Sequence, residues 1–155
     1  MAITCFRGRY TKLGNYSPCC IFYEGHAYNS VEHAYQAQKS IDPAIQKMIR
    51  DAASAAQSKK IARAVQIRSD WDEVKVPIML TLLREKFSQE PERSVLLATG
   101  EEELVEGNWW HDTFWGQCPI GTGENHLGKL LMQVRKEQSR GNFATVSETY
   151  SPQAQ

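Results

Sequence analysis

Residues 29–39 have the sequence NSVEHAYQAQK, around which the rest of the chain is organised. The stretch predicts a helix that starts with Asn29 or Ser30 as its N-cap, because short polar side chains accept hydrogen bonds from the free backbone amides at a helix start. Its interior is rich in alanine and unbranched side chains, which favour helical backbone. We expect the helix to stop before Asp42 and Pro43, since the residue before a proline disfavours helical geometry.

A polar row runs along this predicted helix. At 3.6 residues per turn, Glu32, Gln36 and Lys39 fall within about 60° of one another, and the opposite side, which includes Ile41, is expected to pack. One interpretation is a solvated polar face, which is common on surface helices. The other is that Glu32 and Lys39 flank a ligand, with Gln36 between them and Tyr35 at its edge. Spacing alone does not choose between these interpretations.

Length and composition suit one ordinary globular domain. We assign residues 1–138 of the 155 to the domain and the polar residues 139–155 to a loose tail. The 18 basic and 18 acidic side chains cancel, so no overall field attracts DNA or an anionic membrane. The sequence has neither a signal-peptide pattern nor an apolar run of roughly 20 residues, so we expect a cytoplasmic protein that does not bind a membrane.

The cysteines do not suggest a metal site. Cys19 and Cys20 are adjacent, which is not the spacing of a usual zinc-binding pair. Packing therefore explains them better than a zinc site completed by Cys118 and His26. We expect reduced thiols, no metal and no cofactor.

Beyond the central stretch, the sequence predicts a β-hairpin and five further helices. The hairpin spans residues 20–28 and turns at Gly25, and residues 104–106 are expected to form a short strand. Pro77 lies inside the predicted helix 71–87, so we expect a kink or a new helix start there. The helices are expected to begin near residues 42, 54, 71, 90 and 125. The predicted fold class is mainly α with a small antiparallel β element, an α+β domain.

Residues 107–123 form a long segment rich in aromatic residues and glycine. Loops of this length inside a compact domain are usually functional or disordered, and the tryptophans argue against disorder. Trp115 precedes Gly116, which would let a ligand approach an aromatic face. Asp112 has a simpler interpretation as a cap of the following turn. Trp71 likewise has a simpler interpretation, as an anchor in the core at the start of a helix.

The sequence EHAYQAQK at residues 32–39 resembles the central signature of the NADAR family, also called the YbiA-like proteins. Further segments match in the family's order, and the resemblance runs from about residue 5 to residue 134. These segments are Asn15-Tyr16-Ser17, Asp70-Trp71, Lys86-Phe87, Leu104-Val105-Glu106, Asp112-Thr113-Phe114-Trp115-Gly116 and Asn125-His126-Leu127-Gly128. In the family pattern glycine is usual where this chain has Cys118 and Pro119, which changes the shape of the loop.

The resemblance implies an N-glycosidase that cleaves ribose from a base or amine. Some members of the family act on phosphorylated riboflavin-pathway intermediates, and others remove ADP-ribose from guanine in nucleic acid. As catalytic residues we assign Glu32, Lys39 and Asp112. The substrate-binding residues that the resemblance implies are Asn15, Trp71, Trp115, Gly116 and Asn125. From their place beside the predicted site we add Gln36, Tyr28 and Tyr35.

These residue types fit the chemistry. Breaking a ribosyl C–N bond passes through an oxocarbenium-like species, which a carboxylate stabilises while it handles a proton or activates water. Glu32 is assigned this role, with Asp112 as second carboxylate. Lys39 has two open roles, as a contact to a phosphate or hydroxyl, or as an amine nucleophile that forms a Schiff base with the opened sugar. The second role requires a neutral amine and hence a lowered pKa.

Several functions stay open. The favoured substrate is ADP-ribosylated guanine in a nucleotide or a short nucleic acid, and the runner-up is a small phosphoribosyl metabolite of riboflavin synthesis. A non-catalytic module that binds ADP-ribose or a nucleotide is one alternative. Another is an interaction protein whose aromatic loop contacts a partner. No obligate protein partner is evident from the sequence.

Overall fold

The computed structural model describes residues 1–141. Ser139, which we assigned to the tail, is the last residue of the final helix. Residues 142–155 of the predicted tail lie outside the described residues. None of the helices in the described part has the length and apolar character needed to cross a membrane. The elements in chain order are β1 (Ala2–Ile3), the 3-10 helix η1 (Gly8–Leu13), β2 (Ile21–Tyr23), β3 (His26–Tyr28), α1 (Val31–Ala37), α2 (Pro43–Arg50), α3 (Ala55–Ala62), α4 (Trp71–Lys86), α5 (Glu92–Ala98), β4 (Glu103–Leu104) and α6 (His126–Ser139).

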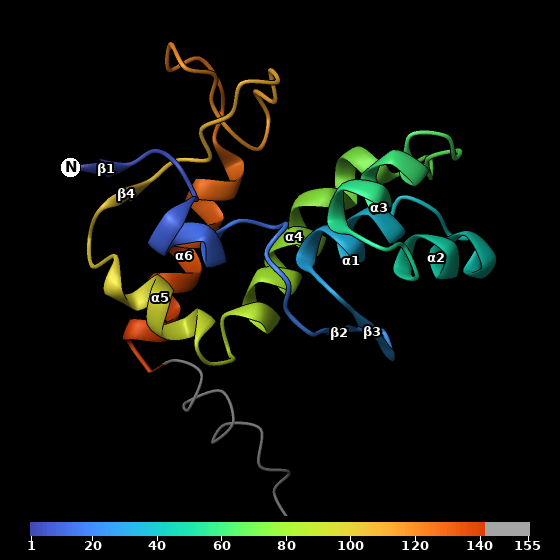
Figure 1. Cartoon of the computed structure of the whole chain (residues 1–155), viewed down its shortest axis with the longest axis horizontal. Coiled ribbons are helices and arrows are strands. Elements are labelled where there is room, and N and C mark those ends of the chain that lie inside the picture. The colour runs from blue at the N-terminus through green and yellow to red at the C-terminus, as the bar shows by residue number, and fades with distance from the viewer. Residues whose placement is uncertain (142–155) are drawn as a thin grey trace, which may run out of the picture.

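The predicted fold class, mainly helical α+β, is confirmed (Figure 1). The predicted hairpin is present, with β2 antiparallel to β3 and a left-handed turn through Glu24 and Gly25. A second pair was not predicted: β1 runs parallel to β4, with Ala2 opposite Glu103. Because this pair joins segments about 100 residues apart, no local sequence pattern predicts it.

Helix α1 is buried along its whole length. Ser30 caps it by accepting a hydrogen bond from the His33 amide at 3.1 Å. All residues from Val31 to Ala37 are buried, because α2, α3 and α4 surround the helix. The interpretation of the polar row as a solvated face is therefore wrong. The expected packing of Ile41 is also wrong: the helix ends before it, and its side chain is 74% exposed.

Helix α4 passes through Pro77 without interruption, so the alternative of a new helix starting there is wrong. Pro77 is exposed, and the carbonyl that lacks its usual partner one turn earlier can therefore be hydrated. Asp70 precedes the helix but does not cap it through its side chain. Instead Arg68 binds both of its carboxylate oxygens, at 2.6 Å and 3.0 Å.

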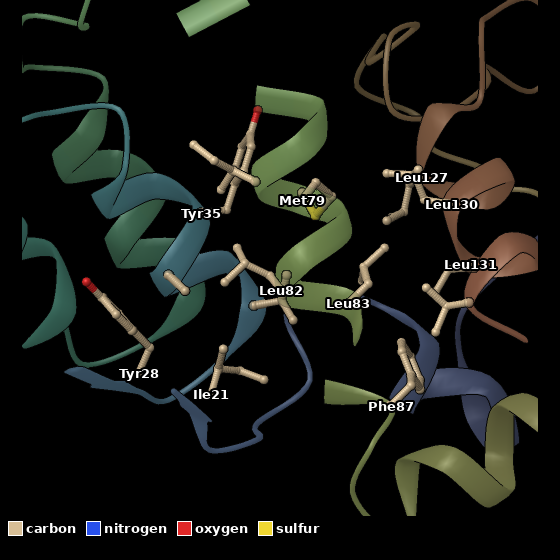
Figure 2. Packing of buried hydrophobic residues seen from close by; sticks show 14 of the residues in the cluster. Ile21, Tyr28, Tyr35, Met79, Leu82, Leu83, Phe87, Leu127, Leu130 and Leu131 are labelled. Carbon is tan, nitrogen blue, oxygen red and sulfur yellow. The ribbon is translucent and has the colours of Figure 1, made fainter. Parts of the chain in front are cut away.

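The core lies on both sides of α4, as Figure 2 shows. Ile21 and Tyr35 lie on the side of the hairpin and α1. Leu130 and Leu131 lie on the side of α6, where Phe87 at the end of α4 meets them. Helix α4 is thus the common support for α1 and for the segment that leads into α6.

Candidate active site

A cleft of about 450 Å³ lies beside α1, and segments from distant parts of the chain form its other walls. Residues 14–18 after η1, α1 and the loop around residues 106–115 supply most of its lining. The cleft brings together seven of the residues that the sequence analysis selected. They are Asn15, Glu32, Tyr35, Gln36, Lys39, Asp112 and Trp115.

Glu32 lies at the base of the cleft and is held in place from two sides. Its backbone amide donates to the Asn15 carbonyl at 3.1 Å, and its Oε1 accepts a 2.7 Å hydrogen bond from Gln36 Nε2. The side chain is 6% exposed, and this burial raises its pKa. The Gln36 hydrogen bond, Lys59 and Lys39 act in the opposite direction and favour the carboxylate.

Two amide oxygens in the cleft are free to bind a ligand. Within residues 1–141, Gln36 Oε1 and Asn15 Oδ1 are buried without a hydrogen-bond partner. Both residues line the cleft, and Gln36 is only 3% exposed. Because buried polar atoms are nearly always paired, these two oxygens suit hydroxyl or N–H donors of a bound molecule.

The amine of Lys39 is half-buried in the cleft. Burial lowers its pKa, and the nearby cations Lys59, Arg63 and Lys75 lower it further. Glu32 acts in the opposite direction and stabilises the charged form. The amine also lies 5.8 Å from the ring centroid of Tyr35. This environment increases the share of neutral amine, which a nucleophilic role needs.

Asp112 lines the cleft and also organises the loop. Its Oδ1 accepts hydrogen bonds from the amides of Phe114 at 3.2 Å and Trp115 at 2.9 Å. Asn108 exchanges two further hydrogen bonds with the Asp112 backbone, at 2.9 Å and 3.0 Å. The carboxylate therefore caps the turn, as the simpler interpretation held, but through Phe114 and Trp115 rather than through Thr113.

One wall of the cleft is aromatic. Trp115 Nε1 donates to the Tyr35 hydroxyl at 3.1 Å, with the two rings edge to face and their centroids 5.6 Å apart. Trp71 also packs against Tyr35, with a centroid distance of 5.0 Å. Burial raises the pKa of the Tyr35 phenol, so this residue stays neutral. Trp71 is 8% exposed and supports Tyr35 from outside the cleft lining, in agreement with its interpretation as a core anchor.

Three other selected residues also lie outside the cleft lining and have protein partners. Tyr28 is 2% exposed, and its hydroxyl accepts a hydrogen bond from Gln38. Asn125 is 4% exposed and bonds the backbone of β4 and the residues after it. Gly116 packs against the Glu106 carbonyl. Contact of these residues and Trp71 with substrate stays a prediction.

The cleft also contains residues that the sequence analysis did not assign. Burial, together with the nearby carboxylates Asp112 and Glu32, raises the pKa of Glu106 to about 7. Glu106 belongs to a segment that matched the family, so that match was the available signal, but we interpreted it as a strand residue. Lys59 also lines the cleft and was not selected from the sequence. The other unassigned lining residues include Arg7, Tyr16 and Trp110.

Two further features bear on the predicted chemistry. Cys118 and Pro119 do not line the cleft, and the Cys118 amide closes a turn with the Thr122 carbonyl at 2.9 Å. In the part of the chain that the structure describes, no group of three or more His, Cys, Asp or Glu side chains is arranged to hold a metal ion. The groups that line the cleft are carboxylates, amides, amines and aromatic rings.

Comparison with known proteins matches this chain to one family. Residues 5–138 match the family described as NADAR domain. An N-glycosidase of Nostoc punctiforme is 42% identical over 134 residues, covering 83% of this chain and 85% of that protein. A protein of Vibrio vulnificus named as a riboflavin biosynthesis protein is 43% identical over 128 residues. That alignment covers 81% of this chain but only 35% of the Vibrio protein.

A solved structure is also similar. The NMR structure of YbiA from E. coli has a TM-score of 0.79 and 32% sequence identity, and the match covers 92% of this chain and 89% of that one. The curated sequence of E. coli YbiA, named as an N-glycosidase, is 35% identical over 131 residues. Sequence and fold thus indicate the same family.

Proposed function

This chain belongs to the NADAR family, and we propose that it is an N-glycosidase that hydrolyses the C–N bond between ribose and a base. One observation carries the proposal: the cleft buries the Glu32 carboxyl beside the Lys39 amine and beside two unpartnered amide oxygens. A cluster with a purely structural role would pair its buried acceptors, so these two oxygens support a site for a ligand. The names of the relatives from Nostoc punctiforme and E. coli support the same chemistry.

Glu32 is the residue that stabilises the reacting sugar. As the C–N bond breaks, positive charge develops on C1 and the ring oxygen, and a fixed carboxylate stabilises that charge without reorganisation. The Gln36 hydrogen bond fixes the orientation of the Glu32 carboxylate. The same carboxylate then accepts a proton from the water that attacks C1.

Lys39 has the two roles that the sequence left open. As a cation it binds a phosphate or hydroxyl oxygen of the substrate. As a neutral amine it attacks C1, and loss of the base and opening of the sugar ring give an imine that water hydrolyses. The lowered pKa of Lys39 supports the second role. Borohydride reduction during turnover tests it directly, because the reduced imine leaves the sugar attached to Lys39.

We favour a small phosphoribosyl pyrimidine as the substrate, and one feature of the cleft supports this choice. Its volume of about 450 Å³ suits a single small molecule. Lys59 in the lining, with Arg63 at the C-cap of the same helix, supplies positive charge for a phosphate. The relative from Vibrio vulnificus is named as a riboflavin biosynthesis protein, which agrees with this class of substrate.

ADP-ribosylated guanine is the second candidate substrate, and one observation favours it. Trp110 lines the cleft and is 56% exposed, so its ring is available to stack on a base outside the cleft. The neighbouring Trp109 is 73% exposed and extends the aromatic surface. A nucleic acid substrate would use this surface, whereas a small metabolite would not need it.

The test is release of free sugar, followed by mass spectrometry. The purified protein is incubated with the ribosyl-phosphate pyrimidine intermediates of riboflavin synthesis and, separately, with a guanine-ADP-ribosylated DNA oligonucleotide. We expect release from the first substrate, a loss of at least 100-fold in Glu32→Gln, and little change in the exposed control Glu103→Gln. Binding without release from either substrate would instead identify a non-catalytic module.

A further inference from the structure

Glu106 carries a third carboxyl group into the cleft, after Glu32 and Asp112, and its backbone is held on both sides. Its amide donates to Asn125 Oδ1 at 3.0 Å, and its carbonyl accepts from the Gln117 amide at 2.8 Å. Asn125 Nδ2 also donates to the Leu104 carbonyl at 2.9 Å. The side-chain amide of Asn125 thus pairs with the Leu104 carbonyl and the Glu106 N–H, as the backbone of a neighbouring strand would.

Gly116 contributes to the same arrangement. A Cβ at this position would lie 2.1 Å from the Glu106 carbonyl oxygen and 3.1 Å from Glu106 Cγ. Only glycine therefore allows the aromatic loop to pack so closely over Glu106. Gly116 and Asn125 were selected as substrate-binding residues, but their observed contacts both serve to position Glu106.

The electrostatic surroundings of Glu106 and Glu32 differ in kind. Burial and the charge of Asp112 raise the pKa of Glu32 as well, but Glu32 has an amide donor in Gln36 and two cations, Lys59 and Lys39, which counteract that rise by favouring the charged form. Glu106 is affected by burial and by the carboxylates Asp112 and Glu32, and all three influences favour its protonated form. Tyr16 is also close enough to both glutamates for each to raise the pKa of its phenol. Two carboxyl groups held in such different surroundings are suited to opposite roles in proton transfer.

We propose that Glu106 is the general acid of this glycosidase and that Glu32 is the ionised carboxylate. This inference rests on the proposed function. The Glu106 O–H proton passes to the base nitrogen as the C1–N bond breaks, and the bonding electrons leave with the base. Water adds to C1 and gives its proton to Glu32, so one water is consumed for each base released. Transfer of a proton from Glu32 to solvent and from solvent to Glu106 restores the starting state.

Asp112 does not take this role. Its Oδ1 accepts hydrogen bonds from two backbone amides of the loop, which is a use for a charged carboxylate. A residue that gives up a proton to the leaving base must instead be neutral before the reaction. Asp112 acts on Glu106 through its negative charge and acts on the loop through its hydrogen bonds.

The experiment compares Glu106→Gln with Glu103→Gln, which is the same substitution at an exposed position of β4. Two substrates are used, the phosphoribosyl pyrimidine and 4-nitrophenyl ribofuranoside 5-phosphate, whose leaving group departs without a proton. We expect Glu106→Gln to lower kcat on the pyrimidine by roughly 100-fold to 10,000-fold and on the nitrophenyl substrate by less than tenfold. The control should match the wild type on both substrates.

The pH dependence gives a second readout that a structural role would not change. In the wild type, kcat/KM on the pyrimidine should fall above about pH 7 as Glu106 loses its proton. That fall should be absent from the residual activity of Glu106→Gln. Equal losses on both substrates, or a retained fall above pH 7 in the variant, would refute the acid role. An inactive wild type on both substrates would refute the proposed function itself, which is a different result.

Discussion

The Trp115 indole donates a 3.1 Å hydrogen bond to the Tyr35 hydroxyl and so ties the aromatic loop to α1. The two residues are 80 positions apart in the sequence. Tyr35 is on the same helix as Glu32, and Trp115 is in the turn that Asp112 caps. This contact therefore sets the distance between the two sides of the cleft.

Tyr35→Phe should loosen that contact while it keeps the ring. The substitution leaves the Trp115 N–H without its acceptor, so we expect the free energy of unfolding to fall by about 1 to 2 kcal/mol. Denaturant unfolding followed by tryptophan fluorescence measures the change. Tyr23→Phe, in β2 and outside the cleft lining, is the matched control. Equal stability of the two variants would show that the hydrogen bond does not hold the loop.

Asn125→Ala should affect stability and catalysis together. It removes the amide that pairs the Leu104 carbonyl and the Glu106 amide, which leaves two backbone groups unsatisfied. We expect a loss of about 2 kcal/mol in the free energy of unfolding and a lower kcat with little change in KM. The exposed Asn29→Ala serves as control, with both variants measured by denaturation and by sugar release. A rise in KM without a change in kcat would indicate that Asn125 binds substrate rather than positions Glu106.

Lys86 should make stability depend on alkaline pH. Its side chain is 0% exposed, its amine donates to the Gly14 carbonyl at 2.8 Å, and burial lowers its pKa to about 8. The unfolded chain keeps the ordinary value of 10.5, so it binds more protons than the folded chain above pH 8.

The free energy of unfolding should therefore rise between about pH 8 and pH 10, by up to about 1.4 kcal/mol per pH unit. Lys86→Met removes this group, and the difference between wild type and variant isolates its contribution. Denaturant unfolding at several pH values checks it. Parallel curves for the two proteins would show that Lys86 stays charged when folded.

Glu106 should behave in the opposite direction. The pKa of Glu106 is about 7 in the folded protein and has the ordinary value of 4.5 in the unfolded chain. The contribution of Glu106 to the free energy of unfolding is therefore complete below pH 4.5 and is lost as the pH rises through 7. Glu106→Gln should therefore be more stable than the wild type at pH 8, by about 2 kcal/mol, and little different at pH 4.5. Thermal unfolding at the two pH values measures the change. A variant less stable than the wild type at pH 8 would indicate a structural role.

The sequence was sufficient to locate most elements because their signals are local. The helices expected to begin near residues 42 and 54 are present, with Asp42 and Ser54 as their N-caps, and so is the hairpin turn at Gly25. Glu32, Gln36 and Lys39 also meet in one cleft: helical spacing puts Glu32 and Gln36 on one face of α1, and the turn after the helix brings Lys39 beside them.

What could not be predicted depends on distant segments. Amphipathic spacing places a polar row toward water, but here the loops that carry Asn15 and Trp115 cover it, so Glu32 is buried. Glu106 follows a strand whose partner lies near the start of the chain, so no spacing pattern placed it in the cleft, and the match of residues 104–106 to the family was the one signal. The environments that shift pKa values arise only after these segments pack together.

The parallel pairing of β1 with β4 has a consequence for synthesis of the protein. The pairing joins Ala2 to Glu103, and the cleft needs residues from Cys5 to Leu127. A ribosome therefore has to release most of the domain before the nascent chain can assemble the cleft. The proposed hydrolase activity should accordingly appear late during translation, and it would report on completed folding of the domain inside a cell.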